Sequence, residues 1–158
     1  MKTKNNRIRS FTKTISYFSF ALFITLISCK SDDTPPNCGC ESETRTTIPE
    51  SANLVGKLFY KDNVDGTNYY DHHYWIIYTE ENCSNCIHHM MVCNEELLEQ
   101  ISNIPVFTDV GDFISYPSHY DNALSVKFSG DLKIICQDVI APGDYTQERI
   151  TLISIEQQ

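Results

Sequence analysis

Apolar and polar side chains alternate in several short segments between residues 53 and 158, which is the pattern of half-buried β-strands. In residues 53–61, Leu54 and Leu58 share one face with Gly56, and a glycine there is typical of a bulge or a sharp bend. Gly130 predicts a similar break further along the chain. The pattern predicts five strands, over residues 53–61, 69–79, 87–93, 123–136 and 149–156.

One segment follows a helical period instead. Asn94 offers a side-chain oxygen to a helix N-terminus, and Glu95 and Glu96 suit the first turn. Pro105 ends the segment. We therefore expect one short α-helix, with an apolar stripe of Leu97, Leu98, Ile101 and Ile104.

Three strands, a helix and two strands follow the order of the OB-fold, a small five-stranded β-barrel. A bent first strand fits, because it must pair with two neighbours when the barrel closes. An open β-sandwich with one helix is the alternative. The runs Ser-Val-Lys-Phe-Ser-Gly at 125–130 and Ile-Thr-Leu-Ile-Ser-Ile at 150–155 resemble small OB-like lipoproteins of Bacteroidetes. Most members are uncharacterised, so this resemblance implies a fold and no activity.

Residues 1–28 follow another pattern. Residues 1–13 contain basic side chains and no acid, and a short apolar run covers residues 15–27. This is the layout of a secretory signal peptide, and the run is short for the alternative, a membrane-spanning helix. Leu26-Ile27-Ser28-Cys29 resembles the lipobox of bacterial lipoproteins. The resemblance implies cleavage after Ser28 and lipidation of Cys29, which would anchor the chain in a lipid bilayer.

The residues after Cys29 bear on location. Lys30-Ser31-Asp32-Asp33 resembles the surface-export signal of Bacteroidetes lipoproteins, and a solvated tether is the alternative interpretation. We therefore expect a protein of the outer membrane that faces either the cell surface or the periplasm. Residues 29–52 are polar and form the expected flexible tether, and residues 53–158 form the expected single domain.

The charge of the chain restricts its partners. All 21 acids lie beyond residue 28, whereas five of the 12 lysines and arginines lie before it. The remaining chain therefore has a formal charge of −14. Such a chain repels phosphate backbones, which argues against nucleic acid. A protein or a glycan is the expected class of ligand.

Six cysteines remain besides Cys29. An even number of cysteines in an oxidising compartment favours three disulfides, and their pairing stays open. Cys38 and Cys40 are only one residue apart, so we expect them to bond elsewhere and to fasten the tether to the domain. The expected disulfide cysteines are Cys38, Cys40, Cys83, Cys86, Cys93 and Cys136.

Two groups of residues are candidates for function. Cys83 and Cys86 form a CxxC that could be a redox pair or, with His88 and His89, a metal site, but a disulfide is favoured in an oxidising compartment. The aromatic residues of the second strand could form a stacking face for a ligand, and the alternative is that they fill the core. These residues are Tyr69, Tyr70, Tyr74, Trp75 and Tyr78. No catalytic constellation and no cofactor motif is found, so a non-catalytic binding module is the leading hypothesis.

Overall fold

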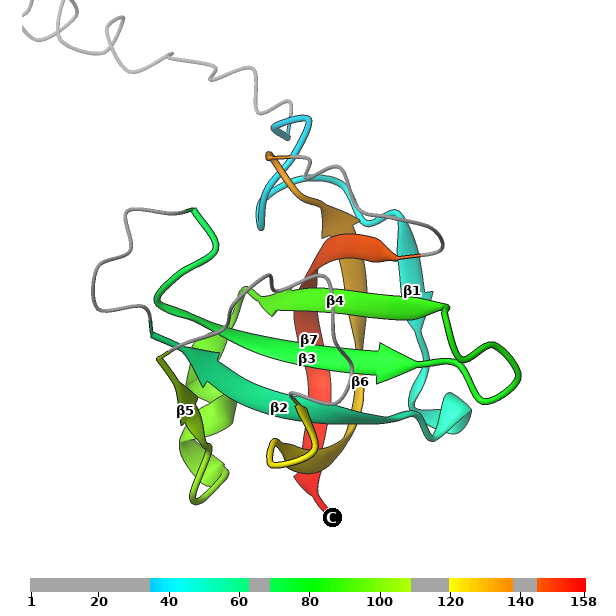
Figure 1. Cartoon of the computed structure of the whole chain (residues 1–158). Coiled ribbons are helices and arrows are strands. Elements are labelled where there is room, and N and C mark those ends of the chain that lie inside the picture. Colours follow the sequence, from blue (N-terminus) through cyan, green and yellow to red (C-terminus); the bar gives the residue numbers. More distant parts are fainter. Residues whose placement is uncertain (1–34, 63–68, 109–119, 138–144) are drawn as a thin grey trace, which may run out of the picture. The chain divides into compact units, whose positions relative to one another are not determined.

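Short strands dominate the computed structural model of the protein, which describes residues 35–62, 69–108, 120–137 and 145–158 (Figure 1). These residues belong to one compact unit, Pro35–Gln158. The elements are β1 (Thr46–Ile48), the 3-10 helix η1 (Glu50–Ala52), β2 (Val55–Lys61), β3 (His73–Thr79), β4 (Ile87–Val92), the 3-10 helix η2 (Glu95–Gln100), β5 (Val106–Phe107), β6 (Leu124–Ile134) and β7 (Thr146–Gln157).

Five of the strands close into a barrel. The strands pair in the order β2, β3, β4, β7 and β6, and β6 pairs back with β2. The pairs are antiparallel except for β4 with β7, which is parallel. In Figure 1, β2, β3 and β4 lie in front, and β6 and β7 cross behind them. The expected OB-like barrel is therefore confirmed, and the open sandwich is wrong because β2 and β6 close the sheet.

Two glycines allow the strands to bend. Gly56 lies where β2 passes from β6 to β3, and a Cβ there would lie 2.8 Å from Ile76 Cγ2 and 3.0 Å from the carbonyl oxygen of Ile77. The pairing of β6 with β7 shifts register between Ser129 and Gly130. The shift falls at the glycine that the sequence pattern indicated, and a Cβ at Gly130 would lie 2.6 Å from the carbonyl oxygen of Thr151, so both positions require a residue without a side chain.

The barrel has one apolar core inside it and a second on the outer face of β2, β3 and β4. Neighbouring residues on a strand face opposite sides of the sheet. Leu58 and Ile76 are fully buried in the inner core, whereas Phe59 and Trp75 are fully buried in the outer core. Residues outside these strands complete the outer core, among them Tyr120, Ala123 and Ile135. Three strands are thus buried on both faces.

The chain before the barrel is fastened to it. β1 pairs with β6, Arg45 N donates to the carbonyl oxygen of Leu132 at 2.8 Å, and Gly39 N donates to that of Ile134 at 2.7 Å. Residues 35–52 were expected to be part of a flexible tether, but they belong to the folded unit. A segment this polar folds because its backbone pairs with β6 and because two disulfides hold it.

The prediction of an α-helix after Asn94 is wrong. Residues 95–100 form a 3-10 helix, and the side chain of Asn94 makes no cap hydrogen bond. Asn94 Nδ2 donates instead to the carbonyl oxygen of Leu152 at 2.9 Å, and Leu152 N donates to Asn94 Oδ1 at 2.7 Å. The amide therefore continues the pairing of β4 with β7 beyond Val92, and a side chain used in this way is not available as a cap.

The remaining differences concern short or terminal segments. The second barrel strand begins at His73 rather than at residue 69, because the chain turns at His72, whose φ is +61°. The last strand is longer than expected and begins at Thr146. β1 and β5 were not expected. The signal peptide, Cys29 and residues 30–33 lie outside the described residues.

Candidate functional site

The aromatic residues of the expected ligand face do not share one surface. Trp75 and Tyr70 are buried in the outer core, and Trp75 Nε1 donates to the carbonyl oxygen of Tyr70 at 3.2 Å. Tyr74 and Tyr78 face the other side of β3 and pack partly against the inner core. A single stacking face is therefore wrong, because alternation along the strand divides the aromatics between two cores.

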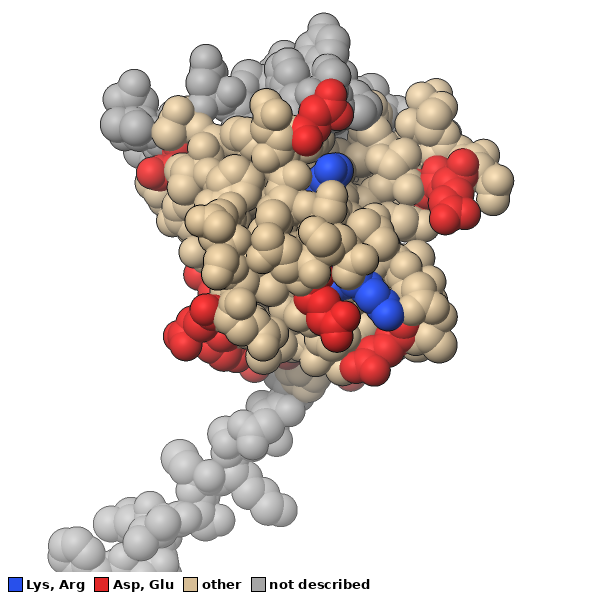
Figure 2. Space-filling view, turned by 90° about the horizontal axis from the view of Figure 1, so that it is seen from below, with Lys and Arg blue, Asp and Glu red and all other residues tan. Residues whose placement is uncertain are grey.

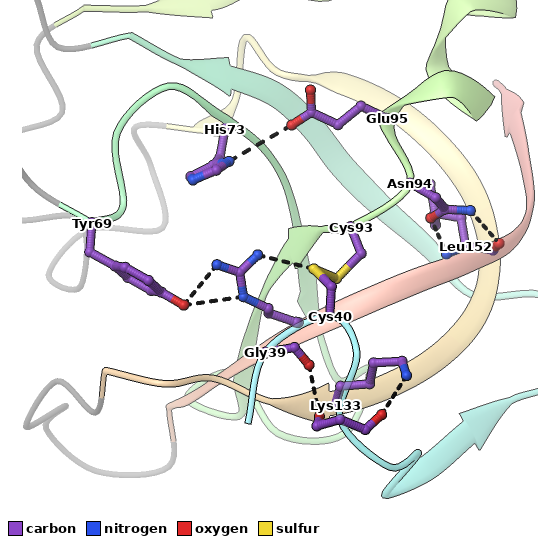
Figure 3. Close-up of a disulfide and its surroundings, with 11 residues drawn as sticks. Gly39, Cys40, Tyr69, His73, Cys93, Asn94, Glu95, Lys133 and Leu152 are labelled. Atoms are coloured by element: carbon purple, nitrogen blue, oxygen red, sulfur yellow. Dashed lines mark hydrogen bonds and ion pairs between the residues drawn. A yellow bond between two sulfur atoms is a disulfide. The ribbon is translucent and has the colours of Figure 1, made fainter. Parts of the chain in front are cut away.

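Tyr69 has a different partner. The Arg149 guanidinium donates to its hydroxyl from Nη2 at 2.7 Å and from Nε at 3.2 Å, and lies 5.3 Å from the centre of its ring. Arg149 Nη1 also donates to Cys40 Sγ at 3.2 Å, beside the Cys40–Cys93 disulfide (Figure 3). Arg149 thus connects the loop before β3 to the disulfide, and its guanidinium binds groups of the protein itself.

All six candidate cysteines are bonded. The pairs are Cys38–Cys136, Cys40–Cys93 and Cys83–Cys86, with sequence separations of 98, 53 and 3. The first two fasten the N-terminal segment to the barrel. The third lies in the hairpin loop between β3 and β4. A redox CxxC is typically found at a helix N-terminus, which lowers the pKa of its thiol, and this pair is not in such a place.

The histidines near the CxxC do not converge on it. His88 Nε2 lies 3.0 Å from Glu80 Oε1, and His88 Nδ1 lies 2.8 Å from Thr146 Oγ1. His89 is buried on the opposite face of β4. Among the described residues no group of three or more potential ligands is placed to hold a metal ion. The structure does not bring Cys83, Cys86, His88 and His89, the alternative metal set, together, because the two thiols are bonded to each other and the imidazoles diverge.

A shallow groove of about 620 Å³ lies between η2 and β3, and we call it the η2 groove. Its apolar part consists of Tyr74, Leu98, Ile101 and Ile104. Three carboxylates from a single 3-10 helix line it as well, and Asn103 completes it. These carboxylates belong to Glu95, Glu96 and Glu99.

The packing of η2 produces this arrangement. Leu98 is buried in the inner core and Leu97 packs partly against it, whereas Glu96 and Glu99 are exposed. Ile101 and Ile104 are only partly buried, so they remain accessible at the groove. The Tyr74 ring lies 4.8 Å from the Tyr60 ring, centre to centre.

Three glutamates and no lysine or arginine of the described residues line the η2 groove. Burial, and after it the carboxylates of Asp62 and Glu95, raise the pKa of Tyr60. His73 Nδ1 lies 3.8 Å from Glu95 Oε1 (Figure 3). Burial, and then the charge of Arg149, lower the pKa of His73 below its ordinary value. The imidazole is therefore neutral near pH 7 and leaves the negative charge of Glu95 in place.

A second groove of about 480 Å³ lies between residues 52–55 and 78–82, and we call it the hairpin groove. Glu80 and Glu81 line it, together with Tyr78. Burial, and after it these two carboxylates, raise the pKa of Tyr78. Glu80 already contacts His88, so this groove has fewer carboxylates available to a ligand.

Most cations of the fold have internal partners. The described residues contain six lysines and arginines and fourteen acids. Five of these six basic side chains form ion pairs or hydrogen bonds within the fold. The face seen from below in Figure 2 accordingly shows acidic side chains around an uncharged centre, with few basic ones. The five are Arg45 with Glu148, Lys57 with Ser125, Lys61 with Asp71, Lys133 with the carbonyl oxygen of Ser42, and Arg149 with Tyr69.

Sequence reasoning did not single out the η2 groove. The signal was present in part, since Glu95, Glu96 and Glu99 flank two leucines within a short segment. Tyr74 belongs to the groove only because of the barrel topology, which a strand pattern does not reveal.

Comparison with known proteins assigns no family. No protein-family model matches the chain, and no curated protein matches it. In the part of the chain that the structure describes, no helix has the length and apolar character to cross a bilayer.

Proposed function

We propose that the protein is a lipid-anchored, non-catalytic binding module of the bacterial cell envelope. Cys29 would hold it in the outer membrane, and the barrel would face the cell surface or the periplasm. The lipobox-like sequence before Cys29 supports the anchor. Three disulfides among the other six cysteines fit a compartment that is oxidising.

The observation that carries the binding role is the separation of charge. The described cations are mostly engaged inside the fold, whereas Glu96 and Glu99 are exposed beside apolar side chains at the η2 groove. Charge displayed in this way favours encounter with a positively charged partner and disfavours nucleic acid. The partner class with the best support is therefore a protein that presents lysine or arginine.

A redox role for Cys83 and Cys86 has less support. The pair lies in a hairpin loop whose turns are closed by backbone hydrogen bonds, from Cys83 N to the carbonyl oxygen of Glu80 and from Cys86 N to that of Cys83. The pair lies between β3 and β4 and not at the N-terminus of a helix, which is one of the settings that lower the pKa of a CxxC thiol.

Carbodiimide cross-linking tests the binding role, because the reagent joins a carboxylate directly to a lysine amine. Envelopes from cells that express the full chain should give a discrete adduct, with the link at a glutamate of this protein and a lysine of a second protein. The Cys29→Ala variant should leave the membrane fraction. Links confined to this chain, in protein that is lipidated and folded, would contradict the proposal.

A further inference from the structure

We infer that the η2 groove docks a cationic amphipathic peptide segment of a partner protein. This inference rests on the proposed binding function and adds the place and the chemistry of the contact. Lysine or arginine side chains of the segment would meet Glu95, Glu96 and Glu99, and an apolar side chain would lie against Ile101 and Ile104.

The carboxylates are available for such a contact. Among the described residues, neither Glu96 nor Glu99 forms an ion pair, and both are exposed. Glu95 Oε1 lies 3.8 Å from His73 Nδ1, and the Glu95 side chain is 43% exposed. Three carboxylates within five consecutive positions of one short helix repel one another, and a cation between them relieves that repulsion.

The apolar part of the groove distinguishes this site from a general acidic surface. Ile101, Ile104 and Tyr74 are each partly exposed beside the carboxylates. Val106, two residues after Ile104, is 55% exposed on β5, which is an edge strand of the sheet. A peptide with apolar residues would cover these side chains, whereas a simple cation would leave them in water.

The shape favours a segment over a small molecule. A volume of about 620 Å³ lies in the range of ligand sites, but such sites usually enclose most of the ligand. The η2 groove is shallow, and it suits a chain that lies across it and continues beyond it. The hairpin groove fits less well, because Glu80 there is engaged by His88.

Fluorescence anisotropy with a labelled synthetic peptide of alternating lysine and leucine tests the site on the folded, disulfide-bonded protein. The Glu95→Gln/Glu96→Gln/Glu99→Gln variant should weaken binding about tenfold, since exposed charge pairs are individually modest but act together here. The control variant Glu41→Gln/Glu43→Gln/Glu156→Gln removes the same charge from exposed positions elsewhere. It should change the dissociation constant by less than about twofold.

Two companion readouts sharpen the result. A peptide in which serine replaces leucine should bind more weakly, because it cannot cover Ile101 and Ile104. Backbone amide shifts in NMR spectra should change over residues 95–104 when the lysine and leucine peptide is added.

Three results would overturn the inference: no binding by the native protein, equal weakening by both triple variants, or equal binding of the serine peptide. Cross-links from envelopes that map to carboxylates outside the η2 groove would also overturn it, while the proposed binding function would stand. A complete lack of intermolecular cross-links would count against the binding function itself.

Discussion

Single residues decide how charge is distributed in this protein. Lys61 and Asp71 form a buried ion pair with 2.7 Å between Nζ and Oδ1, and Glu148 is buried against Arg45. Buried charges are stable only when paired, so the Lys61 ammonium is held inside the fold by Asp71, whereas the exposed Arg45 guanidinium neutralises the buried Glu148 from the surface. Glu96 and Glu99 of η2 have no such role inside the fold and remain exposed. The acidic character of the η2 groove comes from these glutamates, because no lysine or arginine of the described residues lines it.

His73 makes stability depend on pH. Its pKa in the folded protein is lowered, mainly by burial and then by Arg149, from an ordinary value of about 6.5. Below pH 6.5 the unfolded chain therefore binds the proton more readily than the folded chain does. The contribution of His73 to stability is present above about pH 6.5 and is lost as the pH falls through the folded value.

Denaturant unfolding at a series of pH values checks this expectation. The free energy of unfolding should fall between about pH 7 and pH 5 for the native protein, and the His73→Gln variant should lose less over the same window. Glu95, His72 and Arg149 also act on His73, so the comparison is made between variants at each pH. An identical decrease in both proteins would show that His73 does not contribute.

At the scale of elements, the strands were largely predictable and the shorter pieces were not. The alternation of Val126 and Phe128 with polar residues predicted β6, because one of its faces points into the barrel. β1 and β5 span three and two residues, too short for any period to be visible. The pattern suggested an α-helix at residues 95–104, but Asn94 is bound to β7 instead of capping it.

The candidate site was less predictable than the fold. Aromatic residues in β3 suggested a ligand face, yet burial on both sides of that strand places Trp75 in the outer core. A sequence pattern reveals the face of a strand that points inward, but not whether the other face is covered by distant segments. The η2 groove combines β3 with residues beyond β4, and only the closed barrel brings these together.

The disulfides contribute unequally to stability. The Cys40–Cys93 pair closes a much longer loop than Cys83–Cys86, with sequence separations of 53 and 3. In the chain-entropy description, their removal costs about 4 and about 2 kcal/mol, respectively. Loss of Cys40 also removes the contact with Arg149 Nη1, which adds to the cost.

The double variants Cys40→Ser/Cys93→Ser and Cys83→Ser/Cys86→Ser test this order directly. Chemical denaturation without reductant should give the larger loss of unfolding free energy for the first variant. The second variant should keep the native circular dichroism spectrum and should still bind the lysine and leucine peptide. A larger loss of unfolding free energy for the Cys83→Ser/Cys86→Ser variant would contradict this order. It would show that the hairpin disulfide stabilises the fold by more than the closure of its short loop.

At the scale of the whole molecule, the features combine into an acidic barrel that is closed by strand pairing and fastened by disulfides at its N-terminal segment. The disulfides Cys38–Cys136 and Cys40–Cys93 fasten the part of that segment from Cys38 onward to the barrel. The proposed anchor at Cys29 would raise the local concentration of the η2 groove near other envelope proteins, which would help a weak site to function.

Intact mass of the full-length protein, purified from the envelope and alkylated under denaturing conditions without reductant, tests the central claim most directly. We predict a chain that starts at Cys29, carries a lipid there, and has no alkyl group because all six other cysteines are in disulfides. A chain that keeps residues 1–28 and has alkylated cysteines would contradict both the anchor and the oxidising compartment, and with them the proposed role in the envelope.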